Sequence, residues 1–113
     1  MIDLHCHILP GIDDGPTDLS VSLAMARAAV KDGITFIACT PHIYPGLYEN
    51  NRQGIEAAVE AFRRELAAHR IPLQLGTGAD VHLAPDLAGG IRSGRVPTIC
   101  GTRYLLLEPP HHV

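Results

Sequence analysis

The sequence predicts an α/β fold in which about four parallel strands, with helices outside them, form part of a larger barrel. Apolar strand-like runs alternate with helical patterns along the chain, and this order favours parallel strands. The 113 residues are too few for a closed barrel, which takes about 200 to 250 residues. We therefore expect residues 1–113 to be the N-terminal part of one domain. The alternatives are a truncated gene product and a half-barrel that pairs with another copy.

The first strand is expected at residues 2–4, before a loop at 8–16 that is rich in Gly, Pro and Asp. A helix follows, with Thr17 or Asp18 as its N-cap, and it ends near Asp32. Its apolar side chains recur at helical spacing and would form one buried face, which consists of Leu19, Leu23, Ala26 and Val30.

Residues 34–39 are apolar and largely β-branched, which is typical of a strand buried on both faces. A loop is expected at 43–51, and the asparagine pair at its end can start a second helix that runs to about His69. The buried stripe of this helix would consist of Ile55, Val59, Phe62 and Leu66.

The last part of the chain predicts two more strands. Residues 73–78 form the third strand, and a short helix at 85–93 is weakened by its two adjacent glycines. Residues 104–107 form the fourth strand, which Pro109 and Pro110 end.

Composition and charge narrow the function classes. The net charge is −3 without a basic cluster, so a nucleic-acid partner is not expected. No apolar run approaches the ~20 residues that span a bilayer, and the N-terminus lacks a secretory signal pattern, so we expect no membrane insertion. Three cysteines, an odd and widely spaced set, argue against a disulfide framework and favour a reducing cytoplasm.

Potential metal ligands stand at the end of every predicted strand. His5 and His7 are two residues apart on the first strand, so both imidazoles point to one side. His42, Asp80 and Glu108 follow the next three strands. Because parallel strands end at the same edge, these side chains predict a metal centre there, with carboxylates able to bridge two ions. The alternatives are core or loop roles for the histidines, a helix cap at Asp80 and a solvent-exposed Glu108.

The first loop carries Asp13 and Asp14 before a glycine. Either carboxylate can reach the strand ends, where it would bind a metal, orient water or act as an acid, and Asp14 is favoured. The alternative is a plain turn, since Asp-Gly is a common turn pair. Cys6, between the two histidines of the first strand, would point away from the metal and is expected to be a packed thiol rather than a nucleophile.

Four further histidines lie outside the predicted ligand set. His82 lies near the end of the third strand, where it could support the ligands without binding the metal itself. His111 and His112 follow the fourth strand and could approach a substrate. His69 is expected at the solvated end of the second helix.

Five segments carry a family resemblance: residues 1–15 (MIDLHCHILPGIDDG), 22–29 (SLAMARAA), 38–42 (ACTPH), 78–81 (GADV) and 102–108 (TRYLLLE). They resemble the polymerase and histidinol phosphatase (PHP) superfamily, and within it the bacterial manganese-dependent protein-tyrosine phosphatases of capsule and exopolysaccharide synthesis. The resemblance covers nearly the whole chain, and residues 1–15 are its most specific part.

The resemblance implies a distorted TIM-like (β/α)7 barrel that holds two or three divalent ions, with Mn²⁺ expected. The metal ligands that it implies are His5, His7, His42, Glu108 and, where the family commonly has Glu, Asp80. Asp14 and His42 are expected to take part in catalysis. The family's remaining ligands, a further His and a late Asp-x-His, are expected beyond residue 113.

The implied activity is hydrolysis of phosphotyrosine by a metal-activated hydroxide. The implied partner is a bacterial tyrosine kinase that regulates capsular or exopolysaccharide synthesis. One alternative is another PHP phosphoesterase, such as a histidinol-phosphate phosphatase or a polymerase-linked nuclease, although the nuclease would require a basic groove. A second is a truncated metal- or partner-binding module without turnover. An isolated half-barrel would expose a strand edge and apolar surface, so we expect self-association.

Overall fold

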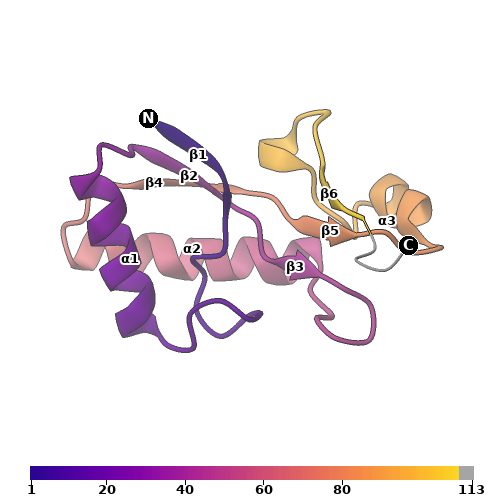
Figure 1. Cartoon of the computed structure of the whole chain (residues 1–113), viewed down its shortest axis with the longest axis horizontal. Coiled ribbons are helices and arrows are strands. Elements are labelled where there is room, and N and C mark those ends of the chain that lie inside the picture. The colour runs from indigo at the N-terminus through magenta and orange to yellow at the C-terminus, as the bar shows by residue number, and fades with distance from the viewer. Residues whose placement is uncertain (110–113) are drawn as a thin grey trace.

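The computed structural model describes residues 1–109 of the chain (Figure 1). One three-stranded sheet consists, in spatial order, of β1 (Ile2–Cys6), β2 (Phe36–Cys39) and β4 (Gln74–Thr77). A second consists, in spatial order, of β3 (His42–Ile43), β5 (Asp80–His82) and β6 (Leu106–Glu108). All strand pairs within these two sheets are parallel, which confirms an α/β fold with parallel strands.

The chain runs from the first sheet into the second twice. β2 continues into β3, and β4 continues into β5. Only Thr40 and Pro41 separate β2 from β3, and only Gly78 and Ala79 separate β4 from β5. Pro41 lacks a backbone N–H for the ladder, which explains the first break. The prediction of one third strand ending at Gly78 was therefore wrong, because the chain continues as β5. The short strand β3 was likewise not predicted, and its second residue, Ile43, lies where the loop at 43–51 was expected to begin.

Some strand ends differ from the predictions because turns use the backbone groups. β1 runs two residues past its predicted end. β2 begins later than residue 34, since the Ile34 N–H donates to the carbonyl of Ala29 at the end of the first helix. β6 begins later than residue 104, because both backbone groups of Tyr104 are used in a turn. The Tyr104 carbonyl accepts a hydrogen bond from the Ile99 N–H, and the Tyr104 N–H donates to Thr102 Oγ1. These contacts belong to an unpredicted 3₁₀ turn at Ile99–Gly101.

The helices lie close to their predicted positions, as α1 (Leu19–Lys31), α2 (Arg52–Ala68) and α3 (Leu87–Ser93). Asp18 and Asn51 cap α1 and α2, because each side chain accepts a hydrogen bond from a backbone N–H in the first turn. α2 buries its whole predicted stripe, and α1 buries Leu23 and Ala26. Leu19 and Val30, at the ends of α1, are partly buried against the same core.

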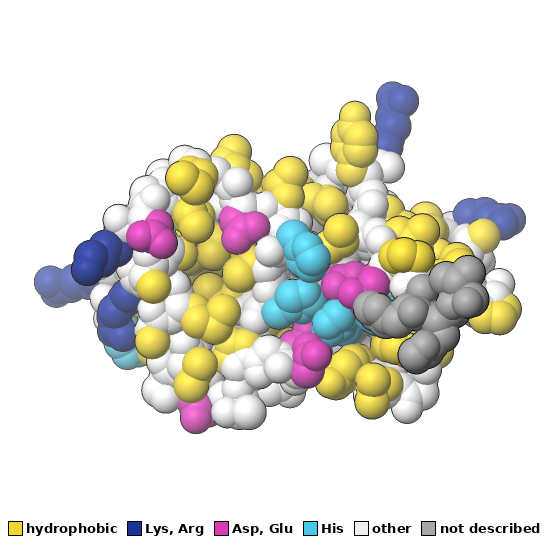
Figure 2. All heavy atoms as spheres, in the orientation of Figure 1, with side chains coloured by type: hydrophobic (Ala, Val, Ile, Leu, Met, Phe, Trp, Pro, Cys, Tyr) yellow, Lys and Arg dark blue, Asp and Glu magenta, His cyan; other side chains and the backbone are white. Residues whose placement is uncertain are grey.

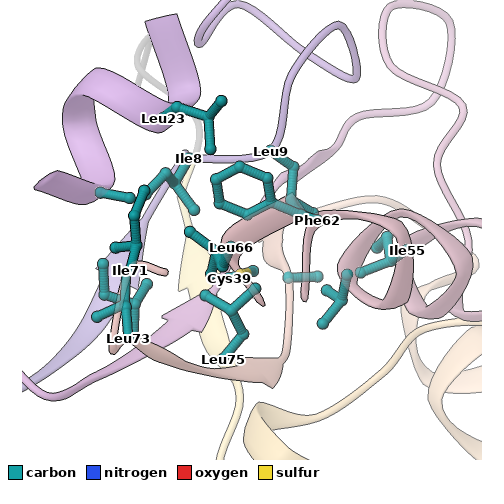
Figure 3. Close-up of a cluster of buried hydrophobic side chains, with 14 of the residues drawn as sticks. Ile8, Leu9, Leu23, Cys39, Ile55, Phe62, Leu66, Ile71, Leu73 and Leu75 are labelled. Atoms are coloured by element: carbon teal, nitrogen blue, oxygen red, sulfur yellow. The ribbon is translucent and has the colours of Figure 1, made fainter. Parts of the chain in front are cut away.

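The hydrophobic core lies between these two helices and the β1-β2-β4 sheet (Figure 3). Ile37 and Cys39 are two residues apart on β2, so both point into this core, where they meet Leu75 of β4. Leu23 of α1 and Phe62 of α2 pack into the same cluster. Both helices therefore cover one side of the sheet, as expected for the outside of a barrel wall. Within residues 1–109, no helix is long and apolar enough to cross a membrane.

Candidate metal centre

All five predicted metal ligands lie close together at the carboxyl ends of the strands. In Figure 2, histidine and acidic side chains gather near the middle of one face. β1 and the residue after it supply His5 and His7, and β3, β5 and β6 supply His42, Asp80 and Glu108. The histidine pair shares one side as predicted, because the two Nε2 atoms lie 3.2 Å apart.

Asp80 lies at the centre of this cluster. Its side chain is only 3% exposed, and its Oδ2 atom faces one ring nitrogen from each of three imidazoles. The distances are 3.6 Å to His5 Nε2, 3.5 Å to His7 Nε2 and 3.4 Å to His42 Nδ1. Buried charges in proteins are normally paired or bound to metals. A buried carboxylate that converges with three imidazoles therefore fits a divalent cation.

Among residues 1–109, three overlapping groups of side chains could hold an ion, and within each group the ligand atoms lie within 4.8 Å of one another. They are His5, His7 and Asp80; His42, Asp80, His82 and Glu108; and His7, Asp13 and His42. Asp80 belongs to the first two groups, so it stands where a carboxylate could bridge two ions. Mixed imidazole and carboxylate ligands suit transition metals such as Mn²⁺, Fe²⁺ and Zn²⁺.

Asp13 holds the first loop against the cluster, although the sequence favoured Asp14. Its Oδ2 atom lies 3.0 Å from His7 Nδ1 and accepts a 2.9 Å hydrogen bond from the backbone N–H of His42. Burial acts to raise the pKa of Asp13, but the hydrogen bonds from His7, His42 and Gly15 outweigh it and lower that pKa. The same contact with Asp13 raises the pKa of His7. A carboxylate on Nδ1 fixes the ring so that Nε2 points at Asp80.

Asp14 lies at the rim of the cluster. Its side chain is 64% exposed, and Oδ1 lies 3.4 Å from His42 Nε2. His42 thus presents Nε2 to Asp14 and Nδ1 to the buried group around Asp80. Tyr48 stacks on the same imidazole, with ring centroids 5.8 Å apart. Asp14 is therefore accessible to solvent while it remains in contact with a predicted ligand.

The sequence placed His82 outside the predicted ligand set, but in the structure it lies against two of the predicted ligands. Its Nε2 atom lies 2.9 Å from His42 Nδ1 and 2.5 Å from Glu108 Oε2. The signal was the spacing Asp-x-His at Asp80, which repeats the His-x-His of the first strand. This signal was missed because the third strand was expected to end before Asp80.

The thiols lie apart from this chemistry. Burial, and then the Asp3 charge, raises the pKa of Cys6 to about 11, and burial chiefly raises the pKa of Cys39 to about 12. Both thiols therefore remain protonated near neutral pH, as expected of packed side chains rather than nucleophiles. His69 lies at the exposed C-cap of α2, as predicted. His111 and His112 lie outside the described residues.

Curated tyrosine-protein phosphatases are similar in sequence to most of this chain. The chain is 36% identical over 110 residues to the tyrosine-protein phosphatase YwqE of Bacillus subtilis, covering 97% of this chain and 43% of that protein. It is 28% identical over 112 residues to the tyrosine-protein phosphatase CpsB of Streptococcus pneumoniae, covering 99% of this chain and 46% of that protein. The chain thus spans less than half the length of these curated relatives.

A solved structure has the same fold. It comes from crystal structures of YwqE from Bacillus subtilis and CpsB from Streptococcus pneumoniae, described as unique metal-dependent tyrosine phosphatases. The TM-score is 0.94 at 37% identity, over all of this chain and 46% of that one. Residues 1–112 also match the family described as capsular polysaccharide synthesis, CpsB/CapC. This chain therefore belongs to the CpsB/CapC family of capsular polysaccharide synthesis.

Proposed function

We propose that this chain is the N-terminal part of a metal-dependent protein-tyrosine phosphatase. The observation that carries the proposal is the convergence of three imidazoles on the buried carboxylate of Asp80. It occurs at the carboxyl ends of parallel strands, in a chain whose relatives are named tyrosine-protein phosphatases. The helices on one side of the sheet support a finer proposal, that residues 1–113 form part of a distorted (β/α)7 barrel.

We propose that the metal ligands in this part of the domain are His5, His7, His42, Asp80 and Glu108. Two or three divalent ions, with Mn²⁺ proposed, would supply Lewis acidity that neutralises phosphoryl oxygens and activates water. Asp13 orients His7 through Nδ1. We propose that Asp14, exposed at the rim beside His42 Nε2, donates a proton to the departing phenolate oxygen. We propose phosphotyrosine on a tyrosine kinase of polysaccharide export as the substrate, in a reducing cytoplasm.

Hydrolysis of a phosphotyrosine peptide tests the proposal. It is measured for this chain and for a chain extended through the following coding sequence, each with added Mn²⁺ and with a chelator. We expect turnover that depends on the metal and is lost in His5→Ala. His69→Ala is the matched control, because His69 is exposed at the far end of α2. Turnover that survives complete metal removal, or that His5→Ala leaves intact, would overturn the proposal.

A second candidate is a metal-binding module without turnover. It is favoured by one observation, that Asp80, with its shorter side chain, stands where the resembled family commonly has Glu. Metal binding without phosphotyrosine hydrolysis by either this chain or the extended chain would support this second candidate over the first. The two candidates share the cluster around Asp80, so metal binding alone does not separate them.

A further inference from the structure

We propose that His82 is itself a metal-binding residue, whose Nε2 atom completes a four-residue site with His42, Asp80 and Glu108. This inference rests on the metal centre of the proposed function, but it does not depend on turnover. It assigns two nitrogen and two oxygen ligands to one ion, on the β3-β5-β6 sheet. Asp80 would connect this site to the His5 and His7 pair.

The strand register brings these four side chains together. Asp80 and His82 are two residues apart on β5, so they point to the same face. In the parallel ladders, His42 of β3 lies beside Asp80, and Glu108 of β6 lies beside His82. The four residues thus occupy neighbouring positions on one face of three strands, and no loop has to move to bring them together.

The distances between the ligand atoms fit one shared ion. His82 Nε2 lies 2.9 Å from His42 Nδ1 and 2.5 Å from Glu108 Oε2. His42 Nδ1 lies 3.4 Å from Asp80 Oδ2 and 3.8 Å from Glu108 Oε2. Metal–ligand bonds of about 2.0 to 2.2 Å place neighbouring ligand atoms roughly 3 to 3.5 Å apart. Shifts of about half an ångström would therefore bring these four pairs to the spacing of ligands on one ion, and the ligand atoms of the whole group lie within 4.8 Å of one another.

The His82 ring is held in this orientation. Its side chain is 11% exposed, and its ring stacks on Tyr44 with centroids 4.1 Å apart. The site is sheltered as a whole, since the side chains of His42, Asp80 and Glu108 are 14%, 3% and 27% exposed. A ring fixed by stacking loses little further freedom when Nε2 binds an ion, which favours binding.

The competing explanation is that His82 only positions Glu108 through a hydrogen bond. Two substitutions separate the explanations. His82→Ala removes both the ring nitrogen and the hydrogen bond. His82→Gln keeps an N–H that can donate to Glu108 but removes the imidazole. His69→Ala is the matched control, an exposed histidine remote from the cluster.

The experiment titrates each variant with Co²⁺, measuring affinity by calorimetry and ligand type by the visible absorption of the bound ion. Circular dichroism verifies that each variant is folded. We expect both His82 variants to bind one Co²⁺ at least about tenfold more weakly and with an altered spectrum. His69→Ala should match the unmodified chain. Wild-type affinity and spectrum in His82→Gln would overturn the proposal in favour of positioning, and unchanged binding in His82→Ala would also overturn it.

The same titration distinguishes this inference from the phosphatase proposal. Co²⁺ binding that depends on His82, together with no phosphotyrosine turnover by either this chain or the extended chain, would support the site while counting against the activity. A folded chain that binds no Co²⁺ would overturn both. Turnover that depends on Mn²⁺, together with Co²⁺ binding that is indifferent to His82, would overturn only the assignment of His82.

Discussion

Gly15 lets the first loop approach the end of β1. A Cβ atom at this position would lie 2.7 Å from the His7 backbone oxygen and 3.0 Å from Asp13 Oδ1. The Gly15 N–H also donates a 2.9 Å hydrogen bond to that carboxylate. The Asp13 carboxylate therefore does two things at once, because it closes the turn with Gly15 and also contacts His7. A turn and a functional role, given above as alternatives for this loop, are both present.

Gly15→Ala should consequently weaken metal binding. We expect the methyl group to displace Asp13 and His7, with a loss of about tenfold or more in divalent-metal affinity. The unfolding free energy should fall by about 1 to 3 kcal/mol. Calorimetric titration and urea unfolding measure the two effects. Gly54→Ala is the control, because its Cβ would meet only Asn51 Oδ1, at 3.4 Å, in the first turn of α2. Equal metal affinity in the two variants would contradict the role given to Gly15.

The thiols of Cys39 and Cys100 should react at very different rates. Cys39 is fully buried and burial raises its pKa to about 12, whereas Cys100 is exposed. Since only the thiolate is alkylated, Cys39 should remain protonated and unmodified at pH 8, while Cys100 reacts. Peptide mass spectrometry after iodoacetamide treatment measures both sites. Cys39 should become labelled once urea unfolds the chain, and rapid labelling of Cys39 in the folded chain would contradict its burial.

At the scale of elements, α2 packs against the β1-β2-β4 sheet and contributes a large part of the core. Its buried stripe packs into the same core as β2 and β4. Phe62 of this stripe is 2% exposed, and its ring lies beside Ile8 and Leu9 (Figure 3). The Arg63 guanidinium adds a 2.7 Å hydrogen bond to the carbonyl of Leu75 on β4. The strand ends that present the metal ligands therefore depend on this helix for their position.

Phe62→Ala should remove a large part of the chain's stability. We expect a loss of about 3 to 5 kcal/mol, since the cavity left by the ring is enclosed by other core residues. Urea unfolding followed by circular dichroism measures the loss. Val21→Ala, at an exposed position of α1, should change stability by less than about 0.5 kcal/mol. A small effect at Phe62 would show that α2 is not essential to the core.

The elements also show why some of the structure could be predicted and some could not. The stripe on α2 followed from its period, because a 17-residue helix repeats its apolar face several times. β3 and β5 have two and three residues, too few for any period to appear in the sequence. The ligands that end longer runs, such as His42, could therefore be predicted. His82 was missed, because its Asp-x-His spacing falls in a strand of three residues and its neighbours depend on the register of β5 and β6.

At the scale of the whole molecule, the cluster around Asp80 lies on two sheets whose outer strands each have one unpaired edge within residues 1–109. Within the described residues, β1 pairs only with β2 and β6 pairs only with β5. Apolar side chains on these outer strands are exposed, with Ile2 64%, Leu4 54% and Leu107 46% accessible. Unpaired strand edges with apolar side chains are surfaces on which other chains add strands.

The 113-residue chain should therefore self-associate in solution. Size-exclusion chromatography with light scattering over a dilution series should show mass above that of the monomer, falling as the chain is diluted. Leu4→Lys should shift the distribution toward monomer, because a charge on an outer strand opposes edge-to-edge pairing. Leu47→Lys is the matched control, since Leu47 is 62% exposed in the loop after β3, away from the outer strands. A monodisperse monomer at every concentration would show that these edges do not drive association. Equal effects of the two substitutions would attribute the association to general hydrophobicity rather than to β1.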